Sequence, residues 1–374
     1  MEQHSVLFDR GPLRSGSHFR APENIIEAWD PADVSGALVA MEEARAGGKW
    51  LAGYATYELG YLLTPKLEYR LPKERNGCLL SFGVFDGVDA PGPAGGVETI
   101  AMAPFEPVWS YDAYSGAFFK VREYIKAGDI YQANLSFPMV SEFNGSLLNL
   151  YDTLKKRQPV SYGAYVDLGN TKLLSRSPEL FFSVSAQGAL RARPMKGTTK
   201  RGSDWHEDER LRAELAQSEK NRAENLMITD LLRNDLGRIS MIGSVRVPKL
   251  FNVETYATVH QMTSEVIAQM LPGTTLREIM TALFPCGSIT GAPKIRAMEI
   301  LSELEPFPRG PYCGAIGWIA PDGAMEFNVA IRTLVCDPSG KITLNVGGGI
   351  VYDSSASGEF DEALLKATFA QLAT

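Results

Sequence analysis

Three charged residues close to the end of the sequence have the spacing of one helical stripe. Glu359, Glu362 and Lys366 follow one another at intervals of three and four residues, so a helix would carry all three on one side. Two carboxylates one turn apart can hold Mg²⁺ through their oxygens, with waters and substrate oxygens completing the coordination. A solvated Glu/Lys face with weak salt bridges is the alternative, and the helix considered alone favours it.

Another carboxylate lies at the edge of an expected core. Glu224, in the segment SEKNRAENLMITDLLRND, comes just before an apolar run. A partly buried carboxylate needs a partner, and a metal ion is one candidate. An ordinary salt bridge to Arg222 or Lys220 is the other candidate, and the local sequence favours the salt bridge.

One lysine has neighbours that can change its chemistry. Lys196 lies in RARPMKGTTKRG, close in sequence to Arg193, Lys200 and Arg201. Burial or nearby cations lower the pKa of a lysine, and the neutral amine is a nucleophile. The alternative is a basic surface loop, which this composition favours when nothing else is known.

Two glycine-rich segments and one arginine indicate contact with an anion. PCGSITGAPK ends in a lysine but does not match the Walker A pattern. GGGI indicates only that some group approaches the backbone closely. Arg332 lies among apolar residues in EFNVAIRTLVC, where an arginine binds an anion or forms a structural ion pair. Both interpretations of Arg332 remain open.

Several classes of function are disfavoured by what the chain lacks. The four histidines suggest no Ser-His-Asp order and no GxSxG elbow is present, which argues against an ordinary serine hydrolase. The net charge of −7 over 374 residues argues against a nucleic-acid or anionic-membrane partner. The four scattered cysteines form no CxxC pair, and the N-terminus has no apolar signal region, so we expect a cytoplasmic protein with reduced thiols. The charged candidates together indicate a Mg²⁺ site of glutamates beside several cations, and hence an anionic substrate.

The elements that must position these residues come in runs of strands with helices between the runs. The apolar spacing predicts helices over 113–129, over 206–234 with a break near Ser218, and over 357–372. Strands are expected at 131–140, 161–168, 179–185, 314–321, 326–336 and 341–351, the last two joined by the turn DPSG. This order predicts an α+β fold with largely antiparallel sheet.

One change of composition bears on domain organisation. The segment 87–96, GVDAPGPAGG, is rich in Pro and Gly and predicts an irregular excursion. It divides the chain into an N-terminal segment, 1–107, and a remainder, 108–374. Whether 1–107 is separate or integrated in the same fold stays open.

Eight motifs within 108–374 together resemble a known family. They are GDIYQANLS, SPELFFSV, the KGT loop, EKNRAENLMITDLLRND, PCGSITGAPKIRAMEIL, RGPYCGAIGWI, FNVAIRT and GGGIVYDSSASGEFDEALLKA. In this order they resemble the chorismate-utilising enzymes, which include anthranilate synthase component I, aminodeoxychorismate synthase component I, isochorismate synthase and salicylate synthase. The resemblance implies a chorismate-binding, anthranilate synthase component I-like fold, in which antiparallel sheets are sandwiched and wrapped by helices around a deep cleft.

The resemblance also implies roles for individual residues. Glu224 and Glu362 match Mg²⁺ ligands, with Glu359 close enough to act through water, and Glu179 matches the general acid that assists loss of the C4 hydroxyl. Lys196 matches the nucleophile. The groups expected to contact substrate are Gln132, Ser288, Tyr312, Arg332, Gly347, Gly348, Gly349 and Lys366.

Two positions favour one branch of the family, and a third agrees with them. Gln132 stands where the water-adding members have a lysine base, and an amide cannot take a proton from water. Lys196 stands where anthranilate synthases have alanine, and Gln261 stands at the position of their catalytic histidine. The resemblance therefore implies aminodeoxychorismate synthase component I, which converts chorismate and ammonia to 4-amino-4-deoxychorismate, with ammonia from solution or a separate glutamine amidotransferase. Anthranilate synthase component I and a catalytically silent chorismate-binding subunit are the alternatives.

Overall fold

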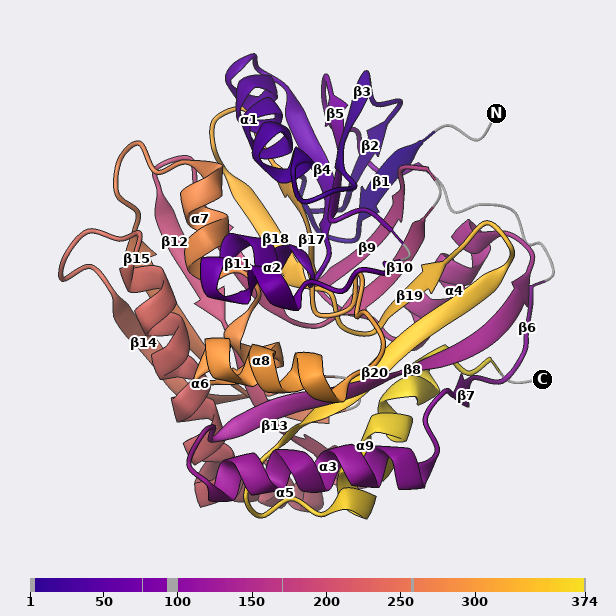
Figure 1. Cartoon of the computed structure of the whole chain (residues 1–374), viewed down its shortest axis with the longest axis vertical. Coiled ribbons are helices and arrows are strands. Elements are labelled where there is room, and N and C mark those ends of the chain that lie inside the picture. Colours follow the sequence, from indigo (N-terminus) through magenta and orange to yellow (C-terminus); the bar gives the residue numbers. More distant parts are fainter. Residues whose placement is uncertain (1–3, 76, 93–99, 170, 257–258, 373–374) are drawn as a thin grey trace.

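The computed structural model describes residues 4–75, 77–92, 100–169, 171–256 and 259–372. Within these residues the chain forms two large antiparallel sheets with helices around them (Figure 1). The strands of the first sheet, in spatial order, are β16 (Gly291–Ala292), β8 (Gln132–Asn144), β20 (Lys341–Ile350), β19 (Thr333–Cys336), β10 (Lys172–Ser177), β9 (Tyr162–Asp167), β1 (Ser5–Phe8) and β2 (Ser17–Arg20), with β6 (Ala101–Met102) and β7 (Glu106–Pro107) also paired to β8.

The second sheet holds the strand that carries Lys196. Its strands, in spatial order, are β13 (Met195–Lys200), β15 (Val259–Gln269), β12 (Ala189–Arg193), β11 (Leu180–Val184), β18 (Met325–Val329), β17 (Ala315–Ile319), β4 (Trp50–Ala55), β5 (Leu80–Phe85) and β3 (Asn24–Ala28), with β14 (Arg246–Thr255) also paired to β15.

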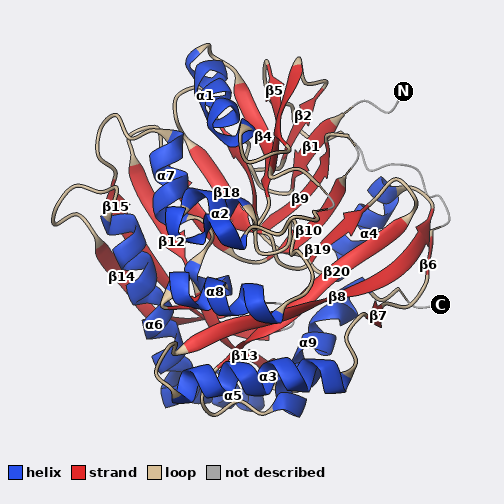
Figure 2. Cartoon of the chain, viewed as in Figure 1, coloured by secondary structure: helices blue, strands red, loops and turns tan. Residues whose placement is uncertain are grey.

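Helices pack against both sheets, and α2 and α8 lie in the middle of the view in Figure 2. They are α1 (Asp33–Ala46), α2 (Leu59–Leu63), α3 (Tyr111–Lys126), α4 (Leu147–Arg157), α5 (Trp205–Gln217), α6 (Glu219–Gly237), α7 (Leu276–Leu283), α8 (Lys294–Leu304) and α9 (Ala356–Ala367), with 3-10 helices at Pro65–Arg70, Gly287–Ile289 and Thr368–Ala370.

The apolar core is divided by the alternation of side chains along the strands. Successive residues of a strand point to opposite faces of its sheet. On β9, Ala164 and Val166 pack into a cluster between the two sheets, whereas Tyr165 packs into a cluster beneath α3, α4, α8 and α9. A third cluster lies under α1, α2, α6 and α7 on the second sheet. The predicted α+β fold, with antiparallel sheets wrapped by helices, is therefore confirmed.

Local sequence explains where the two site-bearing helices begin. Ser218 ends α5 and starts α6, because its backbone is extended and its hydroxyl accepts the Asn221 N–H (3.3 Å). This confirms the predicted break near Ser218. Ser355 caps α9 in the same way by accepting the Gly358 N–H (3.2 Å). α9 ends at Ala367, earlier than the predicted 372, and a 3-10 turn follows.

The single strand predicted over 326–336 is wrong. Residues 325–329 form β18 in the second sheet, whereas residues 333–336 form β19 in the first sheet. The chain crosses from one sheet to the other between them, and Arg332 takes a positive φ of 50° at this crossing. A run of apolar residues cannot distinguish one strand from two strands that bury the same kind of side chain in different sheets.

The N-terminal third contributes strands to both sheets. β1 pairs with β9, and β4 pairs with β17. Part of the predicted excursion 87–96 lies outside the described residues, since the description stops at 92 and resumes at 100. Among the described residues, no helix combines the length and apolar character needed to cross a membrane.

Candidate active site

Three consecutive glycines on β20 form the floor of the candidate site. Gly347, Gly348 and Gly349 pair with Ser136, Leu135 and Asn134 of β8. A side chain at any of the three would clash, and at the last two it would meet polar groups of the site. A Cβ on Gly349 would lie 2.7 Å from Gln132 Nε2 and 3.4 Å from Lys196 Nζ, and one on Gly348 would lie 2.8 Å from Glu359 Oε2. The absence of side chains therefore lets polar groups approach this strand closely, as the GGGI segment indicated.

Lys196 lies inside the site rather than in a surface loop. It stands on β13, and its side chain is only partly exposed. Burial lowers the pKa of its ammonium, and the neighbouring Lys366 ammonium acts in the same direction, while the carboxylates of Glu224 and Glu179 oppose both. The expected neighbour Arg193 is instead paired with Glu254 of β14. The cation that assists Lys196 is thus on the C-terminal helix, not in its own segment.

Glu179 is a buried carboxyl group beside this lysine. Its side chain is 4% exposed, and burial raises its pKa to about 7, against the opposing effects of Ser288 and Lys196. Its Oε1 atom has no hydrogen-bond partner among the described residues. A carboxyl group in this condition holds a proton near neutral pH and can donate it to a bound molecule.

Gln132 is buried with its hydrogen-bonding capacity unused. The residue is fully buried, and neither its Nε2 nor its Oε1 has a partner within the described part of the chain. An unpaired buried amide costs about 1–3 kcal/mol per group. We call Gln132, Glu179, Lys196 and Gly349 the lysine site. Its free donors and acceptors are the ones a polar substrate would satisfy.

The three predicted metal-binding carboxylates lie on two helices next to the lysine site. Glu362 of α9 forms an ion pair with Lys366 (2.9 Å), and Lys366 also donates to Gly347 O (2.9 Å). Although burial opposes the shift, Lys366, Lys196 and Lys220 lower the pKa of Glu362. Ser354 Oγ donates to Glu359 Oε1 (2.7 Å), yet burial still raises the pKa of Glu359.

The donor chemistry at these helices suits magnesium only if other oxygens contribute. In the described ranges no three His, Cys, Asp or Glu side chains group closely enough to hold a metal by themselves. Mg²⁺ is commonly held by one or two carboxylates with waters and substrate oxygens. Glu224 on α6 has no salt bridge to Arg222 or Lys220 among the described residues; Arg222 instead stacks over Phe251 (4.7 Å). The carboxylates fit a magnesium ion that a substrate helps to hold, and this ion remains a prediction.

The GSITGAPK loop is braced against the site by residues that sequence analysis missed. Arg309, 4% exposed, donates to Asn134 O on β8 (2.6 Å) and Ile289 O in the loop (3.1 Å), and pairs with Glu305 (2.8 Å). It thereby fixes the loop that carries Ser288. The signal was present in the motif RGPYCG, which begins with this arginine. Lys294, the terminal lysine of the loop, is held by Asp235 (2.6 Å) and serves structure.

Two further predicted substrate contacts lie in buried surroundings. Tyr312 is 4% exposed, and burial raises the pKa of its hydroxyl. Burial lowers the pKa of Arg332, whose guanidinium has no ion pair or hydrogen bond with any described residue. The alternative of a structural ion pair for Arg332 thus has no partner in the described part of the chain.

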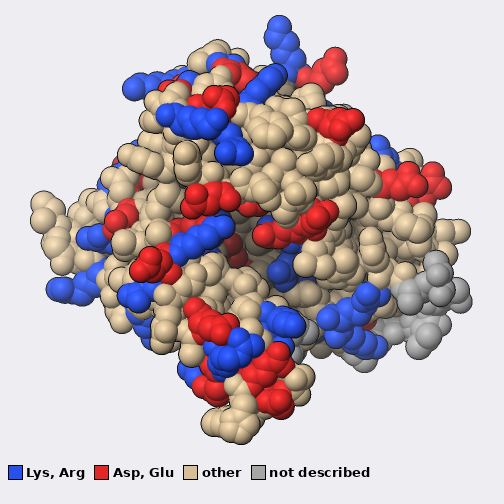
Figure 3. Space-filling model, turned by 90° about the horizontal axis from the view of Figure 1, so that it is seen from below, with Lys and Arg blue, Asp and Glu red and all other residues tan. Residues whose placement is uncertain are grey.

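Other cavities lie away from these groups. One, about 550 Å³, lies between α5 and β14, and a second, about 130 Å³, is lined by residues that include Tyr54, Glu58 and Asn345. On the face that carries α3, α5 and α9, charged side chains of both signs surround a depression (Figure 3).

Comparison with known proteins gives a consistent result. The sequence profile of the chorismate binding enzyme family matches residues 10–371. Over 255 residues the chain is 41% identical to aminodeoxychorismate synthase component 1 of Escherichia coli (strain K12), covering 68% of this chain and 56% of that protein. Over 265 residues it is 41% identical to anthranilate synthase component 1 of Thermus thermophilus, covering 71% of this chain and 57% of that protein. The matched region thus spans little more than half the length of these relatives.

A solved structure extends the likeness over the whole chain. The crystal structure of anthranilate synthase component I from Streptococcus pneumoniae superimposes with a TM-score of 0.83 at 25% identity, covering 99% of this chain and 93% of that one. The expected anthranilate synthase component I-like fold is therefore confirmed.

Proposed function

The chain belongs to the chorismate-binding enzyme family, as its motifs predicted, and we propose that it is a component I of aminodeoxychorismate synthase. In this proposal it converts chorismate and ammonia to 4-amino-4-deoxychorismate, the first step toward p-aminobenzoate in folate synthesis. The observation that carries the proposal is the placement of Lys196 within the lysine site, facing Gly349 and beside Gln132, whose side-chain amide has no partner among the described residues. A relative with that name at 41% identity supports it.

The protonation states in the site suit a covalent route. The neutral amine of Lys196 adds to C2 of chorismate while the C4 hydroxyl departs with the proton of Glu179 as water. Ammonia then adds at C4, and the C2–lysine bond breaks to release the amine. Burial is the main cause of both the lowered pKa of Lys196 and the raised pKa of Glu179, and these shifts favour the neutral amine and the protonated carboxyl group that the two steps need.

Magnesium enters the proposal as a charge-neutralising ion. When bound, Mg²⁺ would offset the charge of a substrate carboxylate, and Glu224 and Glu362 are the residues that would hold it, with Glu359 acting through water. Gln132, Ser288, Tyr312, Arg332, Lys366 and the backbone of the three glycines would hold the rest of the substrate. The lowered pKa of Glu362 keeps it ionised and able to bind a cation.

The ammonia source is part of the same proposal. The name "component 1" of the relatives implies a partner subunit for them, and we propose a separate glutamine amidotransferase for this chain. Glutamine alone should not support turnover by the purified chain, whereas ammonium salts at alkaline pH should, because free NH₃ is the nucleophile.

Anthranilate synthase component I is the second candidate, because a relative of that name is equally similar. The two reactions differ in their products, since anthranilate formation aromatises the ring and releases pyruvate. A chorismate-binding subunit without turnover is the remaining alternative.

One assay separates these three functions. The purified chain is incubated with chorismate, ammonium chloride and MgCl₂, and the products are identified by mass spectrometry, fluorescence and a pyruvate assay. Formation of 4-amino-4-deoxychorismate without pyruvate supports the proposal. Formation of anthranilate with equimolar pyruvate would show that the chain is an anthranilate synthase component I instead. Recovery of unchanged chorismate in the presence of ammonia and Mg²⁺ would show that the chain is a chorismate-binding subunit without turnover.

A further inference from the structure

The strand that carries Lys196 is irregular at that residue. On β13 and β15, Met195 lies opposite Thr263, but Thr198 lies opposite Gln261. Lys196 and Gly197 therefore face a single residue of β15, which is the geometry of a β-bulge. Gly197 has a positive φ of 88°, which a glycine adopts without strain. A bulge interrupts the ladder of backbone hydrogen bonds and changes the direction in which side chains point.

One side chain supplies the hydrogen bonds at the interrupted ladder. Gln261 Nε2 donates to Gly197 O (2.8 Å), and Gln261 Oε1 accepts from Thr198 Oγ1 (2.7 Å). The two halves of one amide thus hold the two residues that directly follow Lys196. A group that only donates or only accepts cannot make both bonds.

The bulge is confined on its opposite side by α6. A Cβ on Gly197 would lie 3.0 Å from the side chain of Asn221. Asn221 is itself fixed, because its Nδ2 donates to Ser218 Oγ (2.8 Å). The backbone beside Lys196 is therefore held between Gln261 on one side and the first turn of α6 on the other.

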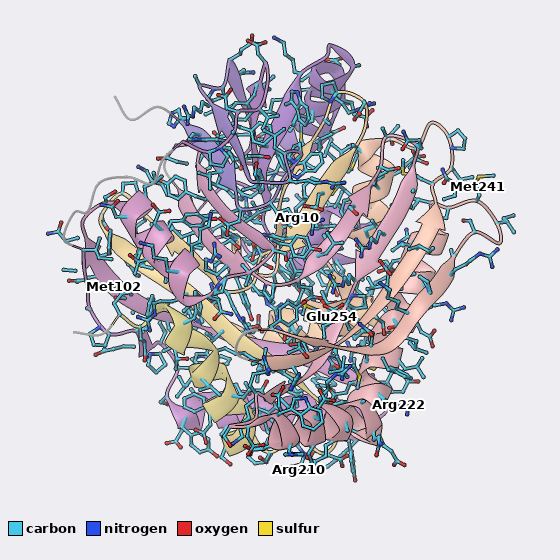
Figure 4. All side chains as sticks on the ribbon, turned by 180° about the vertical axis from the view of Figure 1, so that it is seen from behind. Arg10, Met102, Arg210, Arg222, Met241 and Glu254 are labelled. Atoms are coloured by element: carbon cyan, nitrogen blue, oxygen red, sulfur yellow. The ribbon has the colours of Figure 1, made fainter. Side chains whose placement is uncertain are left out.

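The neighbours of Gln261 are occupied elsewhere and leave its amide available. His260, the preceding residue, is bound to Asp208 Oδ1 (2.9 Å) and Thr255 Oγ1 (3.0 Å). Glu254, opposite Gln261 on β14 and labelled in Figure 4, is paired with Arg193 and accepts from Tyr256 (2.8 Å). The amide of Gln261 thus has the bulge as its partner.

We propose that Gln261 is a positioning residue that holds the β13 bulge so that Lys196 points at Gly349 and Gln132. The nucleophilic role of Lys196 rests on the proposed function, but the positioning itself does not. A displacement of a reacting group by about 1 Å can lower a rate by about 100-fold, so two hydrogen bonds at this position are expected to matter for turnover more than for folding.

The variants are chosen to remove the hydrogen bonds without changing the volume. Gln261→Met keeps the length of the side chain and loses both bonds. Gln261→Glu keeps the acceptor for Thr198, loses the donor to Gly197 and places a negative charge next to the backbone that carries Lys196. The matched control is Gln269→Met on the same strand, where Nε2 donates to Gln187 O (2.8 Å) away from the lysine site.

Two readouts are measured on the full chain. The first is kcat and KM for chorismate with ammonia. We expect Gln261→Met to lower kcat by about 10- to 100-fold with KM within about threefold, and Gln269→Met to keep both. The second is the rate at which an amine-acylating reagent labels Lys196, followed against pH by peptide mass spectrometry. We expect slower labelling in Gln261→Met, and in Gln261→Glu a midpoint at higher pH, because a carboxylate favours the ammonium form.

The outcomes separate this inference from the proposed function. If Gln261→Met keeps the kcat and the Lys196 labelling rate of wild type, the positioning role is overturned. It is also overturned if the only effect of Gln261→Met is a loss of thermal stability equal to that of Gln269→Met. If the wild-type chain makes no aminated product but labelling of Lys196 still depends on Gln261, the positioning stands and the proposed function fails.

Discussion

Two regions of the molecule bury polar groups in opposite ways. One is the Arg176 cluster, which comprises Asp9, Tyr151, Lys155, Gln158 and Arg176. Arg176 is fully buried, yet it donates to Asp9 Oδ2 (2.5 Å) and to Gln158 O (2.9 Å). Tyr151 and Lys155 also reach Asp9 Oδ1, at 2.9 and 3.0 Å. The other is the lysine site, where Gln132 and Glu179 keep buried atoms without partners among the described residues.

The difference indicates what each region does. A buried charge that is paired and hydrogen-bonded holds the fold together, and removing one partner exposes the full cost of burying the other. Buried polar atoms without partners lower stability, so they persist where a ligand supplies the missing bonds. Changes in the Arg176 cluster should therefore alter stability, and changes in and around the lysine site should alter chemistry.

The largest effect is expected for Lys196→Ala. Loss of the nucleophile should lower kcat for amination by about 10⁴-fold, equivalent to about 5.5 kcal/mol in the barrier, with chorismate affinity and unfolding temperature close to wild type. Steady-state kinetics, chorismate titration and calorimetry measure the three. Lys200→Ala, at an exposed position of the same strand, is the control and should behave as wild type. Wild-type turnover in Lys196→Ala would remove the nucleophile from the proposal.

Arg176→Met should have the largest effect on stability. It leaves the Asp9 carboxylate buried without its main partner, so the free energy of unfolding should fall by about 3–5 kcal/mol. Denaturant unfolding measures this. The control is Arg210→Met, which breaks an exposed pair with Glu214 (2.5 Å) and should cost no more than about 1 kcal/mol. Equal losses in the two variants would contradict the assignment of the Arg176 cluster to stability.

Glu362→Gln should weaken the response to magnesium without harming the fold. A neutral amide is a poor ligand for a hard cation, so the Mg²⁺ concentration for half-maximal activity should rise by about 100-fold, or about 2.7 kcal/mol. Activity titrated against MgCl₂ measures the shift. Asp361→Asn, the neighbouring exposed carboxylate on α9, removes the same charge and should leave the titration unchanged. An unchanged titration in Glu362→Gln would remove Glu362 from the proposed metal site.

The smallest expected effect is a change in the pH dependence of stability in Glu179→Gln. Burial raises the pKa of Glu179 in the folded chain from 4.5 to about 7. The stability linked to this proton is present below about pH 4.5 and is lost as pH rises through about 7. Glutamine does not titrate, so its variant has no such loss. The free energy of unfolding of Glu179→Gln should therefore be higher than that of wild type by about 2 kcal/mol at about pH 8.5, with a much smaller difference at about pH 5.

Thermal unfolding of Glu179→Gln and wild type at the two pH values tests this expectation. Burial also raises the pKa of Glu58 to about 7, with the same sign and the same window. Because Glu58 is present in both chains, the difference between them isolates Glu179. A stability difference that is equal at both pH values would show that Glu179 is not protonated in the folded state.

The sequence predicted elements and local spacing well but not contacts between distant segments. The stripe of Glu359, Glu362 and Lys366 forms on α9 as expected, because helical periodicity is a local property. The cation beside Lys196 was expected from its own segment, but it is Lys366, which tertiary structure brings to it. The crossing at Arg332 and the bulge at Gly197 were also not predictable, since both depend on which strands pair.

The pairing of the N-terminal strands has a consequence for how the chain folds. Ala52 of β4 lies opposite Trp318 of β17, and Val6 of β1 lies opposite Val166 of β9. During synthesis, β3, β4 and β5 leave the ribosome long before β17 does. The edge of β4 that pairs with β17 therefore stays unpaired while most of the chain is made. Contacts between residues so far apart in sequence slow folding, and unpaired strand edges favour association between chains. Chaperone dependence and aggregation of nascent chains should therefore be greatest until β17 has emerged.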